Sequence, residues 1–120
     1  MGLTANVTCC WVADHFIPGH PTCGELHSHT WIIYVGVRRK PGYKPLDNGM
    51  IHDFKEIRSW VRGVIDAAGP LLNDIVAIPT CENFLEAWII PQLRRAMPDH
   101  LEVAKVQLWE NDKYFCEWTN

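Results

Sequence analysis

The first third of the chain carries two segments with the hydrophobic pattern of β-strands. Residues 5–16 are rich in strand-forming residues and end just before Pro18-Gly19. Residues 28–38 place four apolar side chains on one face of the predicted strand, which are Trp31, Ile33, Val35 and Val37. The loop between the two segments contains two prolines and two glycines, so we expect two separate strands.

The next segment has the spacing of an amphipathic helix. Within residues 50–68, apolar side chains recur at positions 0, 3, 7, 10 and 11 of a helical pattern, and these are Phe54, Ile57, Val61, Val64 and Ile65. Gly69-Pro70 follows and is expected to end the helix.

A second helix is predicted within residues 79–97. Thr80 is a suitable N-cap, and Glu82 in the first turn suits the positive end of the helix dipole. Pro91 is expected to kink or divide this helix. Its apolar stripe consists of Leu85, Trp88, Ile89 and Leu93.

The last segments predict a β-hairpin. Residues 101–110 and 114–119 flank the polar turn at residues 111–113. The order β-β-α-α-β-β then indicates an α+β domain in which an antiparallel sheet carries both helices on one face. With no repeat and no linker, we expect one domain over residues 1–120.

Composition narrows the classes of function. Hydrophobic residues make up 48% of the chain and charged residues 21%, as in an ordinary globular protein. The net charge of −3 gives no basic face for nucleic acid. No stretch is long and apolar enough to cross a bilayer, and the N-terminus lacks the pattern of a signal peptide. We therefore expect a cytoplasmic protein without nucleic-acid or membrane partners.

Five cysteines in no disulfide-like spacing agree with a reducing compartment. Four of them are expected to be small buried apolar side chains, namely Cys9, Cys10, Cys81 and Cys116.

The stretch CGELHSHTW, residues 23–31, contains the candidate chemistry. His27 and His29 point to the same face of a strand, and a hairpin closed by residues 17–26 would bring His15 beside them. Three histidines with an open position are typical of a catalytic zinc site, although iron or nickel would also bind. The alternative is a chance His-x-His pair that binds no metal. On this pattern alone, Cys23 is a fourth ligand, a base or an ordinary loop residue.

Six short motifs occur in an order that resembles the 6-pyruvoyl-tetrahydropterin synthase family. The bacterial branch, 6-carboxytetrahydropterin synthase of the queuosine pathway, is similar in length, and the resemblance covers residues 5–118. The motifs are His15, Cys23-x-x-x-His27-x-His29, Gly49-Met50-x-x-Asp53-Phe54, Leu72-Asn73-Asp74, Pro79-Thr80-x-Glu82-Asn83 and Trp109-Glu110.

The resemblance implies the tunnelling fold, in which the sheets of three subunits join into a barrel and two rings stack as a hexamer. Active sites then lie between subunits. By resemblance, zinc is bound by His15, His27 and His29, and Cys23 is the general base. Glu110 anchors the pterin and belongs to the catalytic relay, and Thr80 also binds substrate. The implied reaction converts 7,8-dihydroneopterin triphosphate to 6-carboxy-5,6,7,8-tetrahydropterin, acetaldehyde and triphosphate.

One departure from the family pattern affects the expected relay. The family has an Asp-His pair before the Leu72-Asn73-Asp74 motif, but this chain has IDAAGPLLND. Aligned without a gap, the pair becomes Ala68-Gly69. With a two-residue insertion Asp66 is kept and Ala67 replaces the histidine. Two smaller departures are Asp14 before the first ligand and Ser28 at a position where the family has glycine.

Three functions remain open from the sequence. The chain could catalyse the family reaction with a substitute acid–base group, although the remaining histidines, His20, His52 and His100, lie away from the family position. It could be a divergent pterin lyase that uses Glu25 near the metal. It could also be a zinc-bound pterin-binding oligomer without turnover. Because Cys23 and all three ligands are intact, the sequence favours a zinc-dependent pterin lyase.

Overall fold

The computed structural model describes residues 2–120 as an elongated molecule with a four-stranded antiparallel sheet. The strands lie in sequence order, so each pairs with the next along the chain. They are β1 (Ala5–His15), β2 (His27–Arg39), β3 (Leu101–Trp109) and β4 (Phe115–Thr119). The α+β prediction is confirmed, and the predicted strand limits are correct to within one residue at each end.

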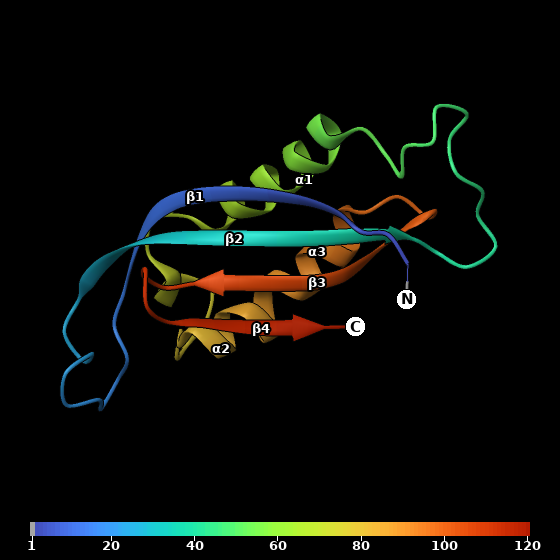
Figure 1. Ribbon diagram of the computed structural model, residues 1–120. Helices are drawn as coiled ribbons and strands as arrows, with labels where there is room; N and C mark the ends of the chain where they lie inside the picture. The colour runs from blue at the N-terminus through green and yellow to red at the C-terminus, as the bar shows by residue number, and fades with distance from the viewer. Residues whose placement is uncertain (1) are drawn as a thin grey trace.

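All helical elements lie on one face of the sheet (Figure 1). They are α1 (Phe54–Ala68), the short 3₁₀ turn η1 (Leu72–Asp74), α2 (Cys81–Asn83), the π-helical turn η2 (Phe84–Ile89) and α3 (Ile90–Ala96). The core lies between these helices and the sheet. Four side chains of β2 are no more than 1% exposed there, which are Trp31, Ile33, Val35 and Val37.

The ends of α1 are set by Asp53 and Gly69. The Asp53 carboxylate accepts a hydrogen bond of 2.8 Å from the Lys55 backbone N–H and caps the helix. Gly69, with a φ of +75°, ends it. The predicted apolar stripe is buried except for Phe54, which is 56% exposed. Phe54 is the first helical residue and lies over edge strand β1, where no further strand covers it.

The second helix continues through Pro91 instead of being broken there. The Ile90 N–H donates to the Leu85 carbonyl, five residues back, so the turn before the proline is wider than an α-turn. This wide turn accommodates a residue that has no N–H and whose ring would clash with the preceding turn of an α-helix. The expected kink or division is therefore replaced by a local change of helix type.

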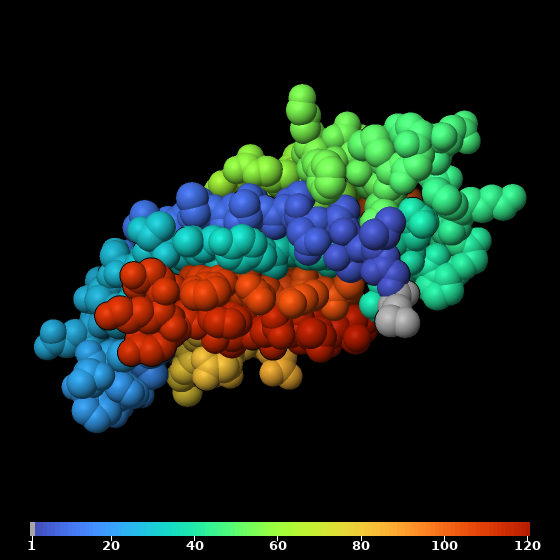
Figure 2. Space-filling view, in the orientation of Figure 1, coloured from blue at the N-terminus to red at the C-terminus, as the bar shows by residue number. Residues whose placement is uncertain are grey.

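The other face of the sheet is open (Figure 2). Its exposed side chains include Val12 and Tyr34. The predicted burial of Cys10 is wrong, because this residue points to the open face and is exposed. The loop over residues 16–26 projects beyond one end of the sheet, and the loop over residues 40–53 projects beyond the other. Within residues 2–120, no helix is long and apolar enough to span a membrane.

Candidate metal centre

Three histidines meet at the end of the β1–β2 hairpin. His15 pairs directly opposite His27, and Ala13 pairs opposite His29, so the register brings all three imidazoles to one face. The ring centroids are 4.5 Å apart for His15 and His27, 5.0 Å for His15 and His29, and 4.8 Å for His27 and His29. One ring nitrogen of each lies within 4.8 Å of the others. The fold thus brings together the three residues for which the sequence predicts metal binding.

Backbone carbonyls fix the orientation of two of these rings. His15 Nδ1 lies 2.9 Å from the Pro79 carbonyl oxygen, and His27 Nδ1 lies 2.6 Å from the Glu25 carbonyl oxygen. A carbonyl can only accept, so each Nδ1 carries the proton and each Nε2 of a neutral ring keeps a free lone pair. This arrangement is how proteins prepare histidine as a metal ligand.

The buried ring of His15 carries an unsatisfied nitrogen. His15 is fully buried, and its Nε2 has no well-directed hydrogen bond to any of the described residues. Glu110 Oε1 lies 3.3 Å from this nitrogen and 3.6 Å from His29 Nε2. A buried lone pair that faces a carboxylate is unfavourable unless a proton or a cation lies between them. The geometry at His15 is therefore suited to a bound cation.

The pKa shifts of His29 and Glu110 also suit a metal. Burial lowers the pKa of His29; the nearby Glu110 carboxylate opposes this shift, whereas His15 and His27 add to it. The pKa of the Glu110 carboxyl is lowered chiefly by its contact with His15, against burial, which raises it. A neutral imidazole and an ionised carboxylate are the forms that bind metal ions. Three neutral imidazole donors fit zinc, and iron or nickel would accept the same set.

Two residues that the sequence reasoning did not assign to the site hold it in place. Trp31 packs beneath it, with ring centroids 5.2 Å from His15 and 5.6 Å from His29. Asn73 accepts a 3.0 Å hydrogen bond from the Phe16 N–H and donates one of 2.9 Å to the Phe16 carbonyl. The Leu72-Asn73-Asp74 motif was the available signal for Asn73, which fixes the backbone directly after His15.

Cys23 and Glu25 lie in the loop that leads to the cluster. The Cys23 backbone N–H donates to His20 Nδ1 at 2.9 Å, and its Sγ lies 3.7 Å from Thr22 Oγ1. Cys23 is outside the group of ligand atoms formed by the three histidines. The Glu25 side chain is exposed, and this residue contacts the site through its carbonyl.

Thr80 and Asp66, two further candidate site residues, both lie outside the histidine cluster. Thr80 caps α2, because its hydroxyl accepts a 3.0 Å hydrogen bond from the Asn83 N–H, which confirms the predicted N-cap. Asp66 is exposed on α1 and outside the group of ligand atoms.

The segment that replaces the family Asp-His pair runs beside β1. The Asp14 N–H donates to the Pro70 carbonyl at 2.8 Å, and Asp14 forms a parallel bridge with Leu71. The two smaller departures from the family pattern also meet, because the Ser28 hydroxyl donates to the Asp14 carboxylate. These two substitutions therefore form one local contact across the hairpin.

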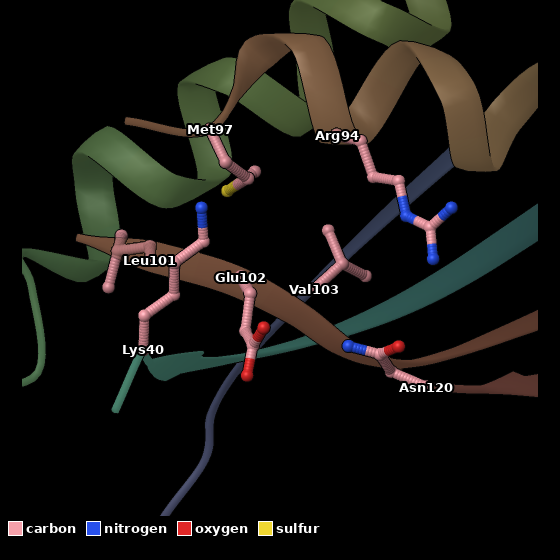
Figure 3. Close-up of a pocket in the computed structure, with 7 residues that line it drawn as sticks. All are labelled: Lys40, Arg94, Met97, Leu101, Glu102, Val103 and Asn120. Carbon is pink, nitrogen blue, oxygen red and sulfur yellow. The ribbon is translucent and has the colours of Figure 1, made fainter. Parts of the chain in front are cut away.

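The cavity shown in Figure 3 lies at the opposite end of the sheet. It has a volume of about 280 Å³ and lies among α3, the start of β3 and the end of β2. It is lined by four polar or charged residues and three apolar ones, which are Lys40, Arg94, Glu102, Asn120, Met97, Leu101 and Val103. None of the three histidines lines this cavity, so the metal centre is a separate site.

Comparison with known proteins shows the family of this chain. The family model described as 6-pyruvoyl tetrahydropterin synthase matches residues 6–120. The chain belongs to this family. Among the solved structures, 6-pyruvoyl tetrahydropterin synthase from Caenorhabditis elegans superposes with a TM-score of 0.75 at 16% identity, over 98% of this chain and 95% of that one. This likeness confirms the tunnelling fold of the subunit.

Two curated relatives have different names. A protein of Archaeoglobus fulgidus, provisionally named 6-carboxy-5,6,7,8-tetrahydropterin synthase, is 33% identical over 88% of this chain and 85% of its own length. The dihydroneopterin monophosphate aldolase of Pyrococcus furiosus is 30% identical over 78% of this chain and 77% of its own. Both names refer to pterins, so this member of the family has relatives with more than one pterin chemistry.

Proposed function

We propose that this protein is a zinc-dependent lyase of the cytoplasm resembling 6-carboxytetrahydropterin synthase. In this proposal it converts 7,8-dihydroneopterin triphosphate to 6-carboxy-5,6,7,8-tetrahydropterin, with release of acetaldehyde and triphosphate, for deazapurine biosynthesis of the queuosine type. The observation that carries the proposal is the convergence of three histidine side chains beside Glu110 in a chain of this family.

The proposed roles follow from the contacts of the site. His15, His27 and His29 would hold the zinc ion, which when bound supplies a Lewis acid that acidifies protons next to a substrate hydroxyl. The carbonyls of Pro79 and Glu25 keep two of these rings oriented. The Glu110 carboxylate, whose lowered pKa keeps it ionised, would accept two N–H bonds from the guanidine-like edge of a pterin.

Cys23 is the proposed base. Cys23 is half-buried in the loop over residues 16–26, which projects beyond the histidine end of the sheet (Figure 1). A cysteine sulfur can act as a general base once it is in the thiolate form. With alanine or glycine in place of the family histidine, Cys23 and Glu110 would carry the proton transfers.

A second candidate function is aldol cleavage of a dihydroneopterin phosphate. It is favoured by the similarity to the aldolase of Pyrococcus furiosus. An aldolase breaks a carbon–carbon bond of the side chain and leaves the phosphate on the released aldehyde. The two candidates therefore differ in a measurable product. A zinc-bound pterin-binding protein without turnover is the third outcome.

The proposed assembly is a homo-oligomer, either a trimer or a hexamer, with pterin sites between subunits. Within residues 2–120, β1 and β4 are the edge strands of the sheet, and each carries an exposed apolar side chain, Val12 on β1 and Phe115 on β4. An edge strand presents unpaired N–H and C=O groups with which a strand of another subunit can pair. Light scattering is expected to give the mass of three or six subunits, and a monomer would contradict composite sites.

A product assay tests the function directly. Zinc-loaded protein is incubated with 7,8-dihydroneopterin triphosphate and, separately, with the monophosphate, and the pterins and aldehydes are identified by mass spectrometry. The expected products are acetaldehyde and carboxytetrahydropterin, with a 10²- to 10⁴-fold lower rate for Cys23→Ala, in the range expected for general base catalysis. Cys10→Ala is the matched control, because Cys10 is exposed on the open face. A phosphorylated aldehyde would favour the aldolase, and retained pterin without product would mean binding alone.

A further inference from the structure

Two thiols that the proposed reaction does not use are in direct contact. Cys81 begins α2 and Cys116 lies on β4, 35 positions later in the sequence, yet their Sγ atoms are 3.1 Å apart. The Cys81 thiol also lies 3.3 Å from the carbonyl oxygen of Leu108, which pairs with Cys116 across the β3–β4 ladder. Helix α2 lies beside strand β4 (Figure 1), and the two sulfurs form one of the contacts between them.

The ligands available around the two sulfurs favour a disulfide over a shared metal. Two thiolates on one tetrahedral zinc ion, each at about 2.3 Å, stand about 3.8 Å apart. The observed 3.1 Å is shorter than this spacing and longer than an S–S bond of about 2.05 Å, so the two sulfurs are in contact but not bonded. Glu82 is the one acidic side chain grouped with the two sulfurs among residues 2–120, and it is exposed. A closed metal site would need four well-held ligands, which this corner does not supply.

We propose that Cys81 and Cys116 form a reversible disulfide bond when the protein meets hydrogen peroxide, and that this bond ties α2 to the edge strand β4. The Cys116 thiolate attacks the peroxide, whose O–O bond breaks to leave a sulfenic acid and hydroxide. The Cys81 sulfur then displaces the hydroxyl from the Cys116 sulfur, and water leaves with the Cys81 proton. Two thiols lose two electrons in all, and the peroxide gains them. A dithiol reductant reverses the change.

The environment of each sulfur suits the reaction step proposed for it. Cys116 is half-buried, whereas Cys81 is only 8% exposed. The hydrogen bond from Cys81 lowers the pKa of the Cys116 thiol, although burial and the acidic Glu82 and Glu110 oppose this. The more accessible and more acidic thiol is thus the one that meets the oxidant, and its partner is already in contact to resolve the sulfenic acid.

The proposed disulfide would lie close in the chain to residues of the candidate metal centre, but neither cysteine is a proposed metal ligand. Cys81 follows Thr80 and Pro79, and the Pro79 carbonyl orients His15. On the other side, Leu108 lies two residues before Glu110. Oxidation removes the Cys81 thiol proton and replaces its non-covalent contacts with a covalent link. We expect it to restrain the segment that carries the Pro79 carbonyl while the histidine cluster stays assembled.

Peptide mapping of the zinc-loaded full chain tests the proposal independently of activity. Trypsin places Cys81 alone in residues 63–94 and Cys116 alone in residues 114–120, while the other three cysteines lie in residues 1–38. After graded peroxide, alkylation and digestion, the expected product is a linked pair of these two peptides, about 2 Da lighter than their sum. Dithiothreitol should separate them. Cys10→Ser should still form the link and Cys116→Ser should not.

Two results would contradict the proposed disulfide. One is recovery of alkylated Cys81 and Cys116 under peroxide that oxidises Cys23. Another is protection of both thiols from alkylation that a chelator removes, without loss of 2 Da, because this would mean a bound metal. The wild-type result stands without the variants, so a Cys116→Ser protein that fails to fold does not remove the test. Failure of the pterin assay leaves this peptide result unchanged.

Discussion

Two clusters in this molecule bring histidine rings into contact, and they differ in what their nitrogens face. In the candidate metal centre, formed by His15, His27 and His29, two rings use Nδ1 to bind backbone carbonyls, and one nitrogen of each ring lies close to those of the others. In the second cluster, His52 Nδ1 lies 3.1 Å from His100 Nε2, and His52 Nε2 binds the Glu56 carboxylate. Both nitrogens of His52 are therefore already occupied.

The difference shows that closeness of histidines is not enough for a metal site. The His52 cluster sits at the other end of the sheet, where it joins the start of α1 to the residue before β3, and Trp60 covers it with ring centroids 5.0 Å apart. Its hydrogen bonds link Glu56 to His52 and His52 to His100 in a row. The three side chains therefore do not direct their metal-binding atoms toward one point. The candidate metal centre instead directs free nitrogen lone pairs toward one another from a partly buried site, as a metal ion needs.

The largest expected effect is on zinc content. His27→Ala combined with His29→Ala leaves one imidazole of three, so bound zinc is expected to fall from about one ion per chain to nearly none. His52→Ala combined with His100→Ala is the matched control and should keep the metal. Elemental analysis after purification and dialysis measures both. Full retention of zinc by the first variant, or equal loss from both, would refute the assignment of the metal centre.

The next largest effect is on the free energy of unfolding, when the tryptophan packed against each histidine cluster is replaced. Trp31 is fully buried, and Trp31→Ala is expected to lower the free energy of unfolding by about 3–5 kcal/mol. Trp60 is half-buried, so Trp60→Ala should cost about 1 kcal/mol. Urea unfolding of the metal-free proteins at one protein concentration measures the two values, since bound zinc would add to the apparent stability.

A reversed order would mean that the His52 cluster is the better packed of the two. Trp31→Phe keeps most of the apolar contact, so it should lose clearly less stability than Trp31→Ala. This milder variant also shows whether the packing beneath His15 and His29 affects zinc affinity in a protein that is still folded.

The sequence predicted the strands, the helices and the three histidines because period and register determine them. A period of two places His27 and His29 on one face, and the antiparallel hairpin places His15 opposite. It did not predict the exposure of Phe54 or the wide turn before Pro91, which depend on where the sheet ends and on the tertiary packing of the helix. The carbonyl of Pro79 also gives no signal, because every residue carries one.

A smaller effect is expected from Asn73, which has no counterpart in the His52 cluster. Asn73→Ala removes two hydrogen bonds to the Phe16 backbone and is expected to cost about 1–3 kcal/mol of stability. Zinc affinity should fall about tenfold, as is usual when a residue that supports a ligand is lost. Asn83→Ala is a suitable control, since its side chain makes one exposed hydrogen bond, to the Ile78 carbonyl. Equal zinc affinity in the Asn73 variant and the wild type would show that β1 holds His15 unaided.

The smallest expected effect separates two roles of Thr80, next to the carbonyl that orients His15. As an N-cap, Thr80→Ala should lower stability by about 1 kcal/mol, whereas Thr80→Asn keeps a capping acceptor and should change it by a few tenths of that. Zinc content should be unchanged in both, because the Pro79 contact is made by the main chain. Chemical unfolding and KM for the pterin substrate are measured on the same preparations. If KM rises in both variants, Thr80 binds substrate through its own side chain. If only the alanine variant changes, and only in stability, Thr80 is a cap and the proposed substrate contact is wrong.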